Sequence, residues 1–152
     1  MAPLVVLFGS LLVLRAVGAL GARPLRSWRG SARGALALML LFTASAHFAP
    51  GLRDDLVRMV PPAMGNAGAW VTITGLAEIA GAIGLLVPRT RRLAGVCLVL
   101  MMIALFPANI RAAREGLDIG GSPATPLPLR AVMQALFVAW TIWVSWPRPP
   151  RR

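Results

Sequence analysis

The stretch "WVTITGLAEIAGAIGLLVPRTRR", residues 70–92, is a long apolar run that ends in a proline and a cluster of arginines. Its apolar part, Gly68–Val87, is long enough to cross a bilayer, because a helical crossing takes roughly 17–25 mainly apolar residues. One ionisable side chain, Glu78, lies at the middle of this run. The stretch therefore predicts a membrane-spanning helix that carries a carboxyl group at mid-membrane.

The composition of the whole chain agrees with this interpretation. Of its 152 residues 57% are hydrophobic, the mean hydropathy is +0.71, and only 14% are charged, whereas soluble domains carry about 25% charged residues. The net charge is +11 and all 16 basic residues are arginines. These arginines lie between apolar runs, where they suit anionic lipid headgroups. We therefore expect an integral membrane protein with the lipid bilayer as its partner, and no nucleic-acid partner.

Apolar runs of spanning character occur five times along the chain. They are Pro3–Leu20, Gly34–Ala49, Gly68–Val87, Leu93–Ile110 and Leu129–Trp146. The second run is the shortest and the least apolar. The expected fold class is all-α, a polytopic membrane helical bundle of one domain.

The first run has two interpretations, a cleaved signal peptide and a retained helix. It has no basic residue before it, Arg15 interrupts it, and four arginines follow it within residues 21–33. Signal peptides start with a basic segment and have an uninterrupted apolar core. The pattern therefore favours a retained transmembrane helix.

The arginines are distributed unequally between alternate connections. Ten of them follow the first, third and fifth runs, namely Arg23, Arg26, Arg29, Arg33, Arg89, Arg91, Arg92, Arg148, Arg151 and Arg152. The other connections hold Arg53, Arg58, Arg111, Arg114 and Arg130, together with four of the five acidic residues. Because cytoplasmic loops carry the excess of arginine, we expect a multi-pass protein of the cell (inner) membrane, with its N-terminus outside and its C-terminus cytoplasmic.

Glu78 is the most unusual residue of the chain. A carboxylate at the bilayer centre costs about 2.5–3.5 kcal/mol on insertion scales, so it has to face the bundle interior, find a partner or be protonated. Small residues accompany it as the repeat Gly75, Gly81, Gly84 and as the pairs Ala77/Gly81 and Ala80/Gly84. Such pairs permit close helix packing. Two roles stay open for Glu78, that of a buried packing residue and that of a proton carrier or ligand anchor.

Other polar residues fall near the expected outer ends of the runs. His47 ends the second run, Asn109 ends the fourth, and Arg130 and Gln134 lie in the first turns of the fifth. With Glu78 as the floor, these residues predict a polar pocket that opens outward. One histidine and one cysteine, Cys97, give no metal-ligand spacing and no CxxC pair, so neither a metal site nor thiol redox chemistry is predicted. No catalytic residue is predicted either.

Several segments together resemble the DoxX family of small bacterial membrane proteins. They are "LMLLFTASAHF", "VRMVPP", "TGLAEIAGAIGLLVPRTRRLAG", "FPANIRAA" and "PLRAVMQALFVAWTIW". The resemblance implies a four-helix membrane bundle over residues 34–147, similar in architecture to the MauE and vitamin K epoxide reductase membrane domains and to the chaperone that assembles nicotinic receptors. An additional N-terminal helix with a basic cytoplasmic linker, residues 1–33, precedes it, and a basic tail, residues 148–152, follows it. The family's matching polar residues here are His47, Glu78, Asn109 and Gln134.

The resemblance implies membrane-complex functions more than a reaction. The founding member is a subunit of a thiosulfate–quinone oxidoreductase, and other members are linked to membrane redox complexes. We therefore expect an accessory subunit, not a stand-alone enzyme, with a membrane or redox partner protein. No cofactor is evident beyond a quinone or lipid in the polar pocket. Two alternatives stay open, a small proton-coupled transporter with Glu78 as its titrating group and an assembly chaperone for other membrane proteins.

Overall fold

The computed structural model describes residues 1–146, so the predicted basic tail, residues 148–152, lies outside the described residues. The expected all-α bundle is confirmed. Its six α-helices are α1 (Ala2–Ala19), α2 (Trp28–Ala46), α3 (Leu52–Met59), α4 (Ala67–Leu86), α5 (Arg91–Arg114) and α6 (Leu127–Ser145). Short 3₁₀ turns, Arg23–Leu25 and Pro62–Met64, occur in the connections, and strands β1 (Asp118–Ile119) and β2 (Ser122–Pro123) form an antiparallel hairpin.

Four of these helices, α1, α4, α5 and α6, are long and apolar enough to cross a membrane, which is the character of a multi-pass membrane protein. The second expected span, α2, has 19 residues but does not reach the same hydropathy. Arg29 and Arg33 near its start lower its mean hydropathy. Because α2 packs against α1, α4 and α6, much of its surface faces other helices instead of lipid.

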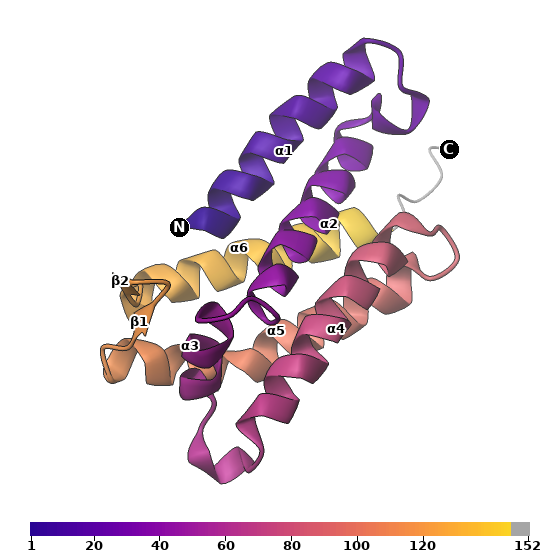
Figure 1. Cartoon of the computed structure of the whole chain (residues 1–152). Coiled ribbons are helices and arrows are strands. Elements are labelled where there is room, and N and C mark those ends of the chain that lie inside the picture. The colour runs from indigo at the N-terminus through magenta and orange to yellow at the C-terminus, as the bar shows by residue number, and fades with distance from the viewer. Residues whose placement is uncertain (147–152) are drawn as a thin grey trace.

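The core of the bundle is built around α2. Figure 1 shows α1 alongside one side of α2 and α4 alongside the other. Leu36 and Leu40 of α2 are fully buried with Leu7 of α1, Leu85 of α4 and Val144 of α6. Several alanines and Ser31 of α2 are buried as well, and side chains of this size let the neighbouring helices approach closely. The one expected span that falls short in hydropathy is therefore the one against which α1, α4 and α6 pack.

The start of α2 differs from the expected span. The helix begins at Trp28, six residues before Gly34, because the Ser27 hydroxyl caps it by accepting a 3.0 Å hydrogen bond from the Gly30 N–H. Arg29 and Arg33 therefore lie in the first turns of α2, not in a linker. The next long helix matches its prediction within one residue, and Asn66 caps it at Ala69 N in the same way.

The connection between α5 and α6 is ordered. It contains the β1–β2 hairpin, which turns at Gly120 and Gly121, both with positive φ. The Asp55 carboxylate of α3 accepts a 2.7 Å hydrogen bond from the Gly120 N–H. A glycine pair suits this turn because it adopts positive φ without steric cost, and the contact with α3 holds the hairpin in place.

Candidate functional site

Glu78 lies in the interface between α2 and α4. Its side chain is directed into the bundle and the residue is 9% exposed. The Thr43 Oγ1 of α2 lies 2.8 Å from Glu78 Oε2 and 3.0 Å from the Leu40 carbonyl. A threonine hydroxyl both donates and accepts, so Thr43 is able to bond Glu78 whether the carboxyl group is ionised or protonated. The partner expected for the intramembrane acid is therefore the Thr43 hydroxyl of the neighbouring helix α2.

His47, the residue that directly follows α2, is the third member of this group. It is 9% exposed, and its Nδ1 lies 2.7 Å from the Val71 carbonyl. Because a carbonyl only accepts, Nδ1 carries a proton, and in a neutral ring Nε2 is then the acceptor nitrogen. His47 Nε2 is 4.0 Å from Glu78 Oε2. The structure thus brings together two titratable groups that share an interior face.

A glycine and an arginine hold His47 against α4. Gly75 leaves room for the ring, since a Cβ atom there would lie 2.7 Å from the His47 Cβ. Arg53 of α3 donates a 2.8 Å hydrogen bond to the His47 carbonyl and 3.0 Å hydrogen bonds to the Gly68 carbonyl and the Thr72 hydroxyl. The end of α2 is therefore tied to the first turns of α4 through a charged side chain.

The remaining predicted residues form a second group between α5 and α6. Arg130 donates a 2.6 Å hydrogen bond to Asn109 Oδ1 and a 2.9 Å hydrogen bond to the Thr125 carbonyl. Gln134 donates to the Met102 carbonyl across the same interface. Asn109 Nδ2 lies 3.5 Å from the Leu105 carbonyl, close to Pro107, which lacks an N–H. These contacts join two helices and satisfy backbone oxygens.

The five predicted pocket residues are thus divided into two groups. Glu78 and His47 lie between α2 and α4, whereas Asn109, Arg130 and Gln134 lie between α5 and α6. Within residues 1–146 no hydrogen bond or ion pair joins the two groups. Ligand binding by either group stays a prediction.

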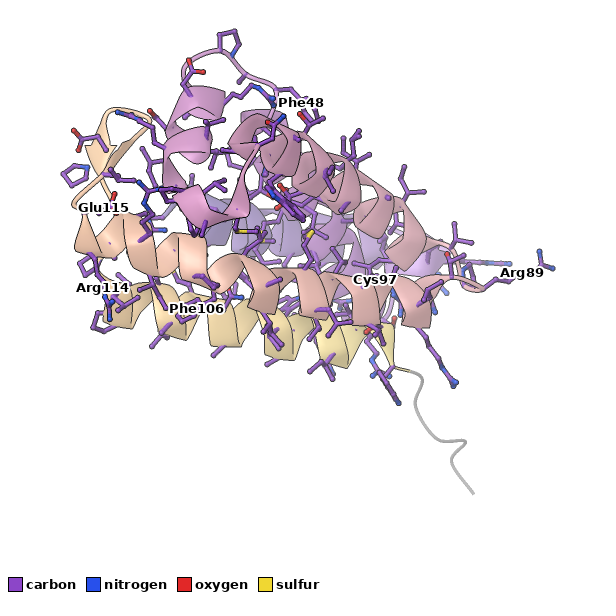
Figure 2. The ribbon with its side chains drawn as sticks, turned by 90° about the horizontal axis from the view of Figure 1, so that it is seen from below. Phe48, Arg89, Cys97, Phe106, Arg114 and Glu115 are labelled. Atoms are coloured by element: carbon purple, nitrogen blue, oxygen red, sulfur yellow. The ribbon has the colours of Figure 1, made fainter. Side chains whose placement is uncertain are left out.

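A groove lies between α4 and α5 on the exposed surface of the bundle. It has a volume of about 630 Å³ and an almost wholly apolar lining. Ala77, Ala80 and Gly84 contribute from α4, and Ala94 and the exposed Cys97 contribute from α5. Cys97 is labelled on α5 in Figure 2. Because these side chains are small, another helix could approach the surface of α4 closely.

A second pocket, of about 890 Å³, lies at the arginine-rich end of the bundle. Arginines from α2, from the α4–α5 turn and from the start of α5 line it, together with Trp28 and Trp146. In Figure 2 Arg89 extends from the end of the molecule opposite to Arg114 and Glu115. The fold therefore gathers basic residues that are far apart in the sequence. Neither pocket is lined by any of the five predicted polar residues.

Two side chains of the α2–α4 group were not among the predicted site residues. Thr43 has a recognisable signal, since it lies four residues before His47 and so on the same helical face. Arg53 has no recognisable signal in the sequence, because its partners are mostly backbone carbonyls, which no sequence pattern identifies.

Comparison with known proteins gives one match. A family model described as a domain of unknown function, DUF8561, matches residues 36–145. The matched segment leaves out α1 and the connection that follows it. No curated protein and no solved structure matches the chain.

Proposed function

The chain belongs to the DUF8561 family, whose match covers well over half of its length, and we propose that it is an accessory, non-catalytic subunit of a membrane complex. In this proposal it is a DoxX-like protein of the bacterial inner membrane with five spans, α2 included. Its N-terminus is outside and its C-terminus is cytoplasmic, as the arginine distribution indicates. The observation that carries the proposal is the apolar groove between α4 and α5.

The occupant that fits this groove is a transmembrane helix of a partner protein. Helices associate in lipid through close van der Waals packing, which small residues make possible. Ala77 and Ala80 are exposed in the groove, while Gly81 and Gly84 are occupied by Leu98 and Ala94 of α5. Two small side chains on α4 therefore remain available for a partner, and the groove floor is already packed.

Photocrosslinking from Cys97 tests this docking surface. Cys97 is the only cysteine of the chain, so a benzophenone maleimide attached to it places one crosslinker in the groove. In native membranes we expect one defined protein adduct. The matched control is Cys97→Ala/Ala139→Cys, which moves the same label to the exposed face of α6. Ala80→Leu should then reduce the adduct about tenfold by filling the groove, whereas Ala139→Leu should not.

Three results would contradict a specific partner helix. A quinone or lipid adduct instead of a protein would make the groove a small-molecule site. Adducts with many different membrane proteins would favour the assembly-chaperone alternative. Equal yields from Cys97 and from Ala139→Cys would mean that the groove has no preferred neighbour.

The Glu78–His47 pair favours a second candidate function, proton transfer. With Nδ1 bonded to Val71, a neutral His47 presents its acceptor nitrogen to Glu78. An ionised Glu78 opposite that nitrogen would place two acceptors face to face. The pair is therefore best satisfied when one of the two, the Glu78 carboxyl group or His47 Nε2, carries a proton. Intramembrane acids with such partners are common in proton pathways.

Proton flux into proteoliposomes tests this second function. If the pair carries protons, Glu78→Gln should abolish a pH-driven flux while leaving the protein folded in detergent. Gln134→Leu, in the other polar group, is the matched control and should retain the flux. Absence of any flux with the wild-type protein would leave the accessory function as the better proposal.

A further inference from the structure

The pocket at the arginine-rich end has an unusual balance of charge. Six arginines line it, namely Arg26, Arg29, Arg33, Arg89, Arg91 and Arg92, and no acidic side chain does. The five acidic residues of the chain lie in α3, at Glu78, and near the β1–β2 hairpin. The positive charge of the pocket is therefore not compensated by any aspartate or glutamate of the protein.

Three of the arginines are positioned by the ends of other helices. Arg29 donates a 2.7 Å hydrogen bond to the Trp143 carbonyl, and Arg33 donates two of 3.2 Å to the Val144 carbonyl, both in the last turn of α6. Arg91 donates a 3.2 Å hydrogen bond to the Leu85 carbonyl at the end of α4. Cationic groups suit these sites, since helix C-termini carry partial negative charge. These bonds fix the arginines of α2 to α6 and Arg91 of α5 to α4.

The other three arginines have no such role. Within residues 1–146 the guanidinium groups of Arg26, Arg89 and Arg92 make no hydrogen bond or ion pair. Arg91 uses only its Nε, so its two terminal amino groups also remain. Charged donors that neither cap a helix nor pair with an acid are available to an anionic ligand.

The position of the pocket indicates where that ligand comes from. Helices α1, α4 and α6 end, and α5 begins, at this end of the bundle. Trp28 and Trp146 line the pocket and are 60% and 52% exposed, which suits the headgroup level of a membrane. The Arg15 guanidinium stacks over the Trp28 ring at 4.5 Å. A phospholipid headgroup in the bilayer would reach the pocket directly.

We propose that this pocket is a specific site for an anionic phospholipid with two phosphate groups, of the cardiolipin type. One phosphodiester neutralises one arginine, and arginine binds phosphate best in a bidentate fashion. The four arginines with available terminal donors, Arg26, Arg89, Arg91 and Arg92, therefore match two phosphates better than one. The volume of about 890 Å³ also lies toward the upper end of the roughly 300–1,000 Å³ typical of ligand pockets. The site uses none of the residues that line the α4–α5 groove, so it does not depend on the proposed function.

Native mass spectrometry of the full chain in mild detergent tests this site. The probes are cardiolipin, phosphatidylglycerol and phosphatidylcholine, each titrated alone, and inorganic phosphate as a competitor. The pocket variant is Arg89→Gln/Arg92→Gln, which removes two arginines without structural contacts. The matched control is Arg23→Gln/Arg114→Gln, which removes the same charge from two exposed arginines outside the pocket.

We expect cardiolipin to bind at least about tenfold more tightly than phosphatidylcholine, and the pocket variant to lose about tenfold in cardiolipin affinity. The control variant should change by less than about twofold. Equal losses in both variants would show attraction to net charge only and would overturn the site. Equal binding of phosphatidylglycerol would overturn the two-phosphate assignment, and displacement by millimolar phosphate would identify a free-anion site instead.

Discussion

Thr43 of α2 and Glu78 of α4 lie in hydrogen-bond contact, with 2.8 Å between Thr43 Oγ1 and Glu78 Oε2. This contact joins the most buried helix to the helix that carries the acid. It also gives Glu78 a partner inside the bundle, which an intramembrane acid requires.

Thr43→Val should destabilise the protein more than the loss of an ordinary surface hydroxyl. Valine has nearly the same shape but leaves Glu78 without its hydroxyl partner, and an unsatisfied buried group costs about 1–3 kcal/mol. Thermal unfolding in detergent measures the effect. Ser45→Ala is the control, because Ser45 is exposed and bonds only the Phe42 carbonyl. Equal melting temperatures for the two variants would mean that the Thr43–Glu78 contact contributes nothing.

Gly75→Ala should disturb the seat of His47. The added Cβ would lie 2.7 Å from the His47 Cβ and 2.9 Å from its Cγ, so α2 and α4 would have to separate. Such overpacking costs about 1–3 kcal/mol. Gly9→Ala in α1 is the matched control, since nothing lies within 4 Å of its Cβ position, and alanine there should stabilise the helix by up to about 1 kcal/mol. If Gly75→Ala were as stable as wild type, the α2–α4 interface would have room for the added methyl group.

Asp55 should make the packing of α3 on the β1–β2 hairpin sensitive to acid. The hydrogen bond from the Gly120 N–H is the main cause that lowers the pKa of Asp55 below the ordinary value of 3.8. The hydrogen bond from Arg58 is the second cause. The folded protein therefore favours the ionised form, and this contribution is complete above pH 3.8 and is lost as the pH falls through the lowered folded-state pKa. The Gly120 amide proton, followed by NMR in micelles, should titrate with Asp55. Asp55→Asn should remove that titration and Asp54→Asn should not. A midpoint above 3.8 would contradict the lowered pKa.

The orientation of the bundle predicts opposite labelling of its two ends. In a Cys97→Ala background, Ser122→Cys should react with an impermeant maleimide added to spheroplasts. Leu20→Cys, at a residue that is 89% exposed in the turn after α1, should react only after permeabilisation. The reverse pattern would mean an inverted topology, and labelling of both from one side would rule out an odd number of spans between them.

Much of the architecture follows from the sequence by itself. The apolar runs determine the helices, because a backbone in hydrocarbon satisfies its hydrogen bonds only within a helix or a closed barrel. Asn66 and Pro88 delimit the fourth α-helix so clearly that its predicted ends match within one residue. The cost of burying Glu78 likewise requires an interior position, and the structure has it there.

The partners of the polar residues are decided only by the tertiary structure. Depth along the helices places His47, Asn109 and Gln134 near one end, but it does not tell which helices are neighbours. Packing separates Glu78 and His47 from Arg130 and Asn109, because α2 lies against α4 whereas α5 lies against α6. The arginine pocket arises in the same way, since the starts of α2 and α5, the α4–α5 turn and the end of α6 meet there. The hydropathy of a segment determines whether that helix is stable in lipid. A site depends in addition on which helices are neighbours and which of their faces are in contact.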